Sequence, residues 1–382
     1  MKAIVLSGGG SKGSYQIGVW RALRKLHIRY DIVTGTSVGA LNGALMVQNK
    51  FHKAIKLWSK INMQLLFGDE ATNSTKIKDV LNMYRINFFK NGGMDVKILE
   101  DVIDKYIDKD IFYNSKIDFG LVAVNLSGKK AVQMKKKDIP KDKLSDYLMA
   151  SASCYPAFQK KDIDGNKFID GGIFDNMPIN LAIDLGADSI IAVDLCAPGV
   201  KARPKKHVDT ITIKPNNKLT NFLNFYEEGS IRNIKFGYND TMKVFGKYKG
   251  YKYTFKKKNI DEAISEYHKL FIHNLNQILN SEKLIKLIDV NLIDQEKLII
   301  KTAEEIGLLL EFDETKIYKF RKFNKKLLKE FKKNKVNSKK ISTIEELYEM
   351  MLKKDYKLLR TTGILHPKEF IEALYLYTIS EV

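Results

Sequence analysis

The sequence of 382 residues contains few cysteines and no long apolar segment. Its two cysteines, Cys154 and Cys196, cannot build a disulfide framework, which favours a reducing compartment such as the cytoplasm. No run of about 18 apolar residues is present that could span a bilayer, and the N-terminus lacks the apolar stretch of a signal peptide. We therefore expect a cytoplasmic protein that contacts membranes, if at all, at their periphery.

The sequence also lacks the spacings that bind metal ions. Its acidic residues form no calcium-binding pattern, and two lone cysteines with scattered histidines make no zinc site. The six histidines lie apart from the glycine-rich turns and strand ends that carry the motifs: His27, His52, His207, His268, His273 and His366. We expect no metal site and no cofactor, and a Ser-His-Asp triad has no well-placed histidine.

What the sequence does contain is the pentapeptide Gly35-Thr36-Ser37-Val38-Gly39. The apolar residues Ile32 and Val33 precede it, and a helix-compatible stretch over residues 40–46 follows it. A serine on a sharp strand-to-helix turn has its hydroxyl held outward at a helix N-terminus. The two glycines permit this turn, because side chains there would clash with the crowded backbone. The pattern predicts Ser37 as a nucleophile.

Two further glycine-rich stretches follow predicted strands. Gly8-Gly9-Gly10-Ser11-Lys12-Gly13 comes directly after residues 3–6, and its unshielded N–H groups can converge on one developing oxyanion. Asp170-Gly171-Gly172 comes after residues 167–169. Because a serine hydroxyl needs a base and no histidine is placed for the task, the pattern favours a Ser-Asp pair with Asp170 as the base.

At this point the chain resembles the patatin-like phospholipases of the bacterial type. The resemblance rests on the two glycine motifs above and on Asp170-Gly171-Gly172-Ile173-Phe174-Asp175-Asn176-Met177-Pro178, and it covers roughly residues 1 to 200. It implies a Ser-Asp lipid acyl hydrolase that acts on phospholipids or lysophospholipids. By the same likeness Ser37 is the nucleophile, Asp170 the base, and Gly8, Gly9 and Gly10 the oxyanion donors. Lys12 falls where the family has a basic residue.

The supporting residues have simpler alternatives. Lys12 either holds the glycine loop, meets a phosphate, or is only solvated, while Asp175 and Asn176 are expected to shape the turn before Pro178. The glycines Gly13, Gly35, Gly39, Gly171 and Gly172 are expected to serve the backbone around the reacting groups.

A dinucleotide-binding fingerprint is the rival interpretation of Gly8-x-Gly10-x-x-Gly13. That fingerprint needs an acidic residue at the far end of the second strand. Asp31 is at about the right distance but precedes the apolar residues Ile32 and Val33, so it lies at the wrong end of the sheet. The motif is not a P-loop either, because its lysine precedes the last glycine.

Strand and helix patterns alternate over the first 200 residues, which predicts an α/β fold. The expected strands are residues 3–6, 32–33, 119–124, 131–134, 167–169 and 189–195, with a short strand at 210–213. Such alternation implies a parallel sheet covered on both faces, a three-layer α/β/α catalytic domain of the patatin-like kind. We place this domain at residues 1–255 and a mainly helical, basic appendage at 256–382.

The net charge of +20 is concentrated near the C-terminus. Residues 316–340 hold twelve basic side chains against Glu330 alone, a net charge of +11. Phenylalanine and leucine recur at helical spacing between about Lys316 and Lys333, as in a helix that lies on an anionic membrane. Docking on the protein's own core is the competing interpretation. No nucleic acid is expected as a partner, because the phenylalanines lie at core spacing and not among the exposed lysines.

Overall fold

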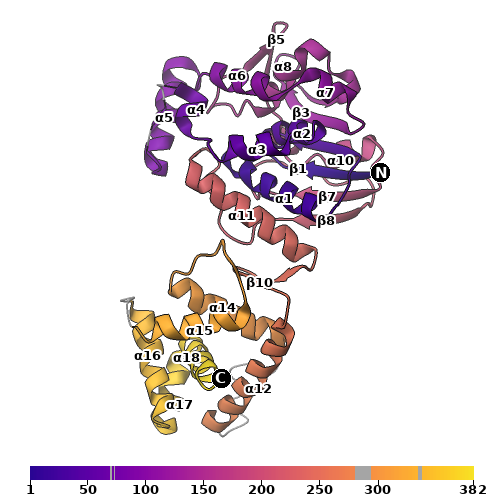
Figure 1. Ribbon diagram of the computed structural model, residues 1–382. Coiled ribbons are helices and arrows are strands. Elements are labelled where there is room, and N and C mark those ends of the chain that lie inside the picture. The colour runs from indigo at the N-terminus through magenta and orange to yellow at the C-terminus, as the bar shows by residue number, and fades with distance from the viewer. Residues whose placement is uncertain (69–70, 73, 280–293, 334–337) are drawn as a thin grey trace. The chain divides into compact units, whose positions relative to one another are not determined.

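The computed structural model describes residues 1–68, 71–72, 74–279, 294–333 and 338–382 (Figure 1). The chain forms two compact units, Met1–Val244 and Phe245–Val382. Across the described ranges, we find no helix with both the length and the apolar character needed to cross a membrane.

The first unit is built on an eight-stranded sheet with the order β5-β6-β3-β2-β1-β7-β8, in which β4 also pairs with β3. Its strands are β1 (Lys2–Leu6), β2 (Ile32–Thr36), β3 (Asp118–Asn125), β4 (Lys130–Lys135), β5 (Lys161–Ile163), β6 (Asn166–Asp170), β7 (Ser189–Val193) and β8 (Asp209–Ile213). The strands from β3 through β2, β1 and β7 to β8 are parallel. The expected α/β fold is therefore confirmed.

One edge of the sheet differs from the expected all-parallel arrangement. β4 and β6 both pair antiparallel with β3, and β5 pairs antiparallel with β6. The physical reason is the length of the connections: only four residues separate β3 from β4 and two separate β5 from β6, and such short links can join only antiparallel strands.

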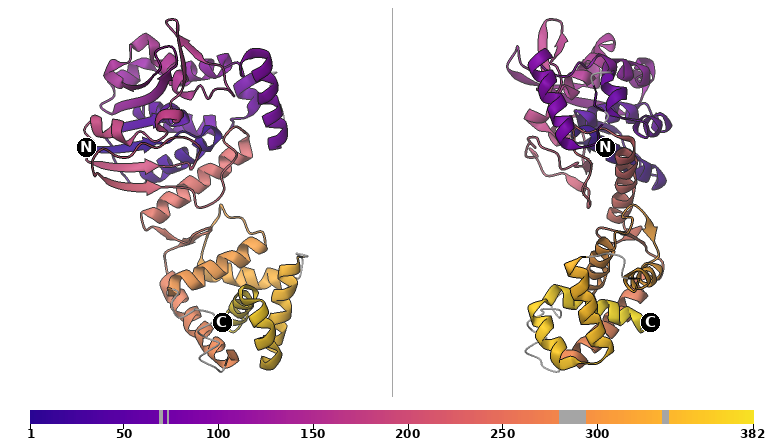
Figure 2. Two further views of the ribbon diagram at one scale, coloured as in Figure 1. Left: turned by 180° about the vertical axis from the view of Figure 1, so that it is seen from behind. Right: turned by 90° about the vertical axis from the view of Figure 1, so that its left-hand side faces the viewer.

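Helices cover both faces of the sheet, which gives the expected three layers (Figure 1). On one face, α10 (Ile179–Asp184) packs its apolar residues into a buried cluster with Ala3, Val5 and Ile190. On the other face, α2 (Val38–Val47) brings Gly43 against Val33 and Phe119. Figure 2 shows the same layers from behind and from the side.

The remaining helices of this unit connect the strands or extend beyond them. They are α1 (Ser14–Lys25), α3 (Phe51–Trp58), α4 (Met63–Phe67), α5 (Ile77–Asn91), α6 (Lys97–Tyr106), α7 (Lys109–Asn114), α8 (Leu144–Ala152), α9 (Gly172–Asp175) and α11 (Glu227–Val244). Residues 51–114 are thus mostly helical.

The second unit is mainly helical and has its own buried core. Its elements are α12 (Ile260–Leu279), α14 (Gln295–Leu309), α15 (Phe320–Phe331), α16 (Lys339–Leu352), α17 (Tyr356–Leu365), α18 (Pro367–Ser380) and a small sheet of β9 (Tyr248–Lys249), β10 (Thr254–Lys256) and β11 (Ile317–Tyr318). The small sheet belongs to this core because Phe255 packs edge-on against Phe320 and Phe323.

The basic segment follows the docked interpretation more closely than the membrane one. It begins with β11 and becomes helical only at Phe320. The apolar stripe of α15 is buried within its own unit, with Phe323 and Leu327 fully covered, while Lys322, Lys325, Lys329 and Lys332 are exposed. Lys335, which contributes to the net charge of this segment, lies outside the described residues. The stripe is therefore not available to insert into a bilayer.

Candidate active site

Ser37 occupies the sharp turn between β2 and α2. Its φ of +56° is uncommon for a residue with a side chain and is typical of a position held under strain by its surroundings. The flanking glycines are required by space: a Cβ on Gly35 would lie 2.3 Å from the Gly39 carbonyl oxygen, and one on Gly39 would lie 2.3 Å from that of Leu6. The expected strand–turn–helix setting of the pentapeptide is thus present.

Ser151, near the end of α8, holds this turn in place. The backbone N–H of Ser37 donates to Ser151 Oγ at 2.9 Å, and Ser151 Oγ donates to the Val122 carbonyl at 2.7 Å. All of Ser151 is buried. This role could not be predicted from the sequence, because a serine inside a helix pattern carries no signal of what it contacts.

Replacing Ser151 with alanine should destabilise the protein by about 1–3 kcal/mol, because the Ser37 N–H and the Val122 carbonyl would both lose a buried partner. Ser153→Ala is the matched control. That serine is equally buried, but its hydroxyl donates only to the Met149 carbonyl of its own helix. Denaturant unfolding of the two variants measures the difference, and equal losses would show that the bridge to Ser37 has no special weight.

Asp170 reaches Ser37 because two strands share one edge of β3. β4 pairs with one edge over Gly120–Asn125, so β2 and β6 must both lie along the other edge. β2 runs parallel to β3 and ends with Thr36 opposite Val122, whereas β6 runs antiparallel and ends with Asp170 opposite Ala123. The two strands therefore end next to each other. Ser37 follows directly after β2 and Asp170 is the last residue of β6, so these two residues are brought together.

The Asp170 carboxylate is buried, and its Oδ1 accepts from the Gly172 N–H at 2.7 Å. Asp170 and Ser37 line the same cavity. Burial raises the pKa of Asp170 to about 6, while the Ser37 side chain and the Gly172 N–H limit the rise. A carboxylate with this pKa is a stronger base than an exposed aspartate.

Two of the three glycines expected to donate hydrogen bonds line a cavity beside Ser37. Gly9 and Gly10 line a cavity together with Ser37. The Gly8 N–H points elsewhere, because it donates to the side-chain and main-chain oxygens of Asn176, each at 3.1 Å. Gly10 has a φ of +52°, and a Cβ there would lie 2.0 Å from the Phe222 carbonyl oxygen, so this position requires glycine.

Lys12 and Asn176 tie this loop to its neighbours. The Lys12 ammonium donates to the carbonyls of Leu195 and Cys196 at 3.5 and 3.3 Å, and partial burial lowers the pKa of Lys12. Asn176 also donates to the Pro198 carbonyl at 3.3 Å. Of the three interpretations of Lys12, these contacts favour the one in which it holds the loop.

The other supporting residues sit where the backbone is crowded. A Cβ on Gly13 would lie 2.4 Å from Val38, and one on Gly171 would lie 2.2 Å from the Val122 carbonyl oxygen. Gly172 supplies the N–H that binds Asp170. Asp175 is buried and accepts from the Met177 N–H at 3.1 Å, as expected for a residue that shapes the turn.

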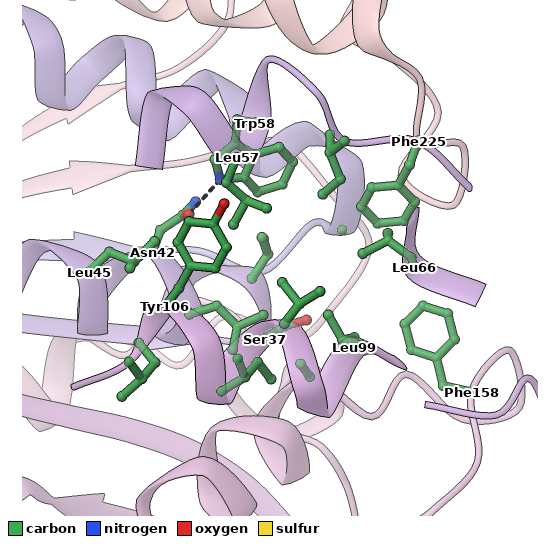
Figure 3. A pocket seen from close by; sticks show the side chains of 18 of the residues that line it. Ser37, Asn42, Leu45, Leu57, Trp58, Leu66, Leu99, Tyr106, Phe158 and Phe225 are labelled. Carbon is green, nitrogen blue, oxygen red and sulfur yellow. Dashed lines mark hydrogen bonds between the residues drawn. The ribbon is translucent and has the colours of Figure 1, made fainter. Parts of the chain in front are cut away.

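An apolar cavity opens beside Ser37 (Figure 3). Its volume is about 90 Å³. Its lining is almost entirely apolar and includes Val38, Leu41, Leu45, Leu57, Leu66, Phe67, Leu99, Tyr106, Phe158 and Phe225. Figure 3 shows Leu57 and Tyr106 on one side of the cavity and Leu66, Phe158 and Phe225 on another.

A second cavity adjoins the first and shares Gly10, Ser37 and Phe158 with it. It also contains the Asp170 carboxylate and Cys154. Burial, assisted by the nearby charge of Asp170, raises the pKa of the Cys154 thiol to about 12, so this sulfur stays protonated near neutral pH. Ser37 is thus the one hydroxyl-bearing residue that lines both cavities.

The histidines do not enter this arrangement. All six are described by the structure, and none lines either cavity. Within the described ranges, no group of three His, Cys, Asp or Glu side chains is placed to hold a metal ion.

The region that holds these residues is similar to a known protein family. The model of the family described as patatin-like phospholipase matches residues 4–183. Patatin-like phospholipase domain-containing protein 7 of rat is 28% identical over 202 residues, which cover 50% of this chain and 13% of the rat protein. Lysophospholipase nte1 of Aspergillus terreus is 27% identical over 197 residues, covering 50% of this chain and 12% of that protein. The match therefore spans a small part of these relatives.

Among solved structures, the crystal structure of VipD from Legionella pneumophila aligns with a TM-score of 0.44 and 14% sequence identity. The alignment covers 99% of this chain and 91% of the VipD chain.

Proposed function

Because residues 4–183 belong to the patatin-like phospholipase family, we propose that this chain is a serine hydrolase that cleaves the fatty acyl esters of phospholipids or lysophospholipids. The observation that carries the proposal is that Ser37 and the buried Asp170 line one cavity at the adjoining ends of β2 and β6, located where that cavity meets an apolar one. The name of the Aspergillus relative, a lysophospholipase, supports the choice of substrate class.

In the first half of the reaction, Ser37 Oγ attacks the ester carbonyl carbon and passes its proton to Asp170. The carbonyl oxygen becomes an oxyanion, which accepts hydrogen bonds from the N–H groups of Gly9 and Gly10. These amides are the best-placed donors, since Gly8 is already bound to Asn176. When the C–O bond breaks, Asp170 returns the proton to the leaving alcohol, and the acyl group remains on Ser37.

In the second half, Asp170 takes a proton from a water molecule as its oxygen attacks the acyl-serine. The second oxyanion uses the same amides, and its collapse releases the fatty acid and restores the Ser37 hydroxyl. A substrate can lie across Ser37 with its acyl chain in the apolar cavity and its alcohol portion in the second cavity. No step requires a cofactor.

The proposal predicts a pH profile with an acidic limb. Asp170 accepts a proton only as a carboxylate, and its pKa is about 6, so kcat/KM for a soluble ester should fall about tenfold for each pH unit below 6. In the range between about 4 and 6, an unperturbed aspartate would leave the rate nearly constant. A profile that is flat down to pH 4.5, in protein shown to remain folded, would contradict the assignment of Asp170 as the base.

We also propose that the exposed lysines of α15 attract the enzyme to anionic membranes by charge alone. The apolar side of this helix is buried within the second unit, so it cannot contribute insertion. Each lysine close to an anionic surface adds roughly 1 kcal/mol, and salt screens the attraction within about 8–10 Å.

Changing Lys322, Lys325, Lys329 and Lys332 to glutamate should therefore weaken binding to anionic vesicles by at least about 100-fold. Raised salt should do the same to the wild type, because no apolar anchor opposes release. Hydrolysis of a soluble short-chain ester should be unchanged. Vesicle co-sedimentation measures the effect, and equal binding by variant and wild type at low salt would leave α15 without a membrane role.

A further inference from the structure

A hollow in the first unit, distinct from the two cavities at Ser37, is lined by four lysines and lies beside the apolar cavity. We call it the lysine hollow. Lys53 and Lys56 belong to α3, Lys60 follows the end of that helix, and Lys105 belongs to α6. All four are exposed at the surface. Two separate helices and the segment after α3 thus contribute lysines to the lining of one hollow.

These lysines have no acidic partners in the part of the chain that the structure describes, where no carboxylate oxygen lies within ion-pair distance of them. Neighbouring lysines on the same stretches do have such partners, since Lys50 lies 3.9 Å from Asp108 and Lys97 lies 3.3 Å from Asp101. Lys53 and Lys56 are three positions apart on one helix, a spacing at which like charges repel. The hollow therefore concentrates positive charge that the protein does not neutralise.

Only one acidic residue lines this hollow. Glu227 begins α11, and its Oε1 accepts a hydrogen bond from Asn62 Nδ2 at 3.3 Å. With four lysines and one glutamate, the hollow carries a net charge of +3.

The lysine hollow and the apolar cavity share part of their wall. Leu57 and Tyr106 line both, and both are half-buried. Figure 3 shows these two side chains together on one side of the apolar cavity. An anionic group in the hollow would thus lie beside a wall, formed in part by Leu57 and Tyr106, that also bounds the cavity in which we place the acyl chain.

We propose that this hollow binds the phosphate groups of an anionic lipid surface. Lysine ammonium groups are common phosphate ligands, and several of them together concentrate attraction at one point of the surface. Binding there would hold the first unit on the lipid by the side nearest the outer wall of the apolar cavity. The inference rests on the proposed lipid hydrolase function, and it names a site on the catalytic unit that is independent of the lysines of α15.

The test measures vesicle binding in the full chain carrying Ser37→Ala, so that lipid is not consumed and a failure of the catalytic proposal leaves the result readable. The hollow variant changes Lys53, Lys56, Lys60 and Lys105 to glutamine. The charge-matched control changes four exposed lysines that do not line the hollow to glutamine: Lys25, Lys129, Lys130 and Lys137. Both variants have the same net charge.

The vesicles are phosphatidylcholine with about one-fifth phosphatidylglycerol. Since each lysine contributes about fivefold to the affinity, we expect the affinity of the hollow variant to fall by roughly 100-fold or more. The affinity of the control should fall by less than about tenfold. Glu227→Gln removes the one negative charge of the hollow and should tighten binding about fivefold. Thermal unfolding of each variant checks that the fold is kept, as expected for exposed side chains. Equal losses in the two lysine variants, or none in either, would overturn the proposal.

A soluble ligand is the other source of the same chemistry. Calorimetric titration with inorganic phosphate separates the two. If the wild type binds phosphate ion in a lysine-dependent way while vesicle binding is unchanged in the hollow variant, the hollow is a site for a soluble phosphate and the lipid proposal is wrong. In protein that retains Ser37, the four glutamines should leave hydrolysis of a soluble short-chain ester unchanged. If no form of the protein hydrolysed the ester, the result would contradict the hydrolase function and leave the proposal for the hollow standing.

Discussion

Ser37→Ala is expected to reduce hydrolysis of acyl esters to the background rate, a loss on the order of 10⁶-fold in kcat by comparison with dissected serine hydrolases. In the proposed mechanism this hydroxyl attacks the ester, and we expect no other residue at the cavities to replace it. The Cys154 thiol, which lines the second cavity, is kept protonated because burial raises its pKa to about 12. A fluorophosphonate probe should label Ser37 in the wild type and should not label the variant.

The controls for this variant follow from its surroundings. Removing one oxygen leaves the strained backbone turn and the Ser151 bridge intact, since that bridge uses the Ser37 N–H. The variant should therefore keep the native fold. Labelling or hydrolysis that survives in folded Ser37→Ala protein would show that the nucleophile has been misassigned.

Asp170→Asn is expected to lower kcat by about 10³–10⁴-fold. The amide keeps the shape of the carboxylate, and its oxygen can still accept from the Gly172 N–H, which donates to Asp170 Oδ1 at 2.7 Å, but it cannot take the Ser37 proton. Replacing each of the six histidines in turn should leave most of the activity. If one of these replacements matched the loss at Asp170, the pair would have to be extended to a triad.

The same substitution should stabilise the folded protein at neutral pH. The folded-state pKa of Asp170 is about 6, above the unfolded value of about 3.9, so the folded state binds this proton more tightly. The contribution of Asp170 to the free energy of unfolding is fully present below about pH 4 and is lost as the pH rises to 6. By pH 7 the loss is about 3 kcal/mol. Asp170→Asn should recover part of this loss, so its melting temperature should exceed that of the wild type at pH 7 but not at pH 4.

Much of the catalytic unit could be predicted because its signals are local. The apolar runs at residues 3–6 and 189–195 correspond to β1 and β7, which are buried on both faces and need no context to be recognised. The glycine positions were equally readable, since only a residue without a Cβ fits against the Leu6 and Gly39 carbonyls.

What could not be predicted depends on contacts between distant segments. Sequence alone placed Asp170 at a strand end, but its approach to Ser37 depends on β2 and β6 sharing one edge of β3. The binding of Gly8 by Asn176, 168 positions away, is of the same kind. The helix α11, which packs against α1 through close approaches such as Gly18 to the Ile234 carbonyl, also went unrecognised because nothing in its own sequence stood out.

We propose that Ser37 and Asp170 cleave the acyl ester bond of phospholipids or lysophospholipids. The decisive experiment is mass spectrometry of the products from a mixed lipid panel in ¹⁸O-labelled water, using the wild type, Ser37→Ala and Asp170→Asn. We expect the wild type to release free fatty acid that carries ¹⁸O and to leave the phosphate ester intact. The two variants should release almost no fatty acid. Release of a phosphorylated head group, fatty acid without the label, or equal fatty acid release by Ser37→Ala would contradict the proposal.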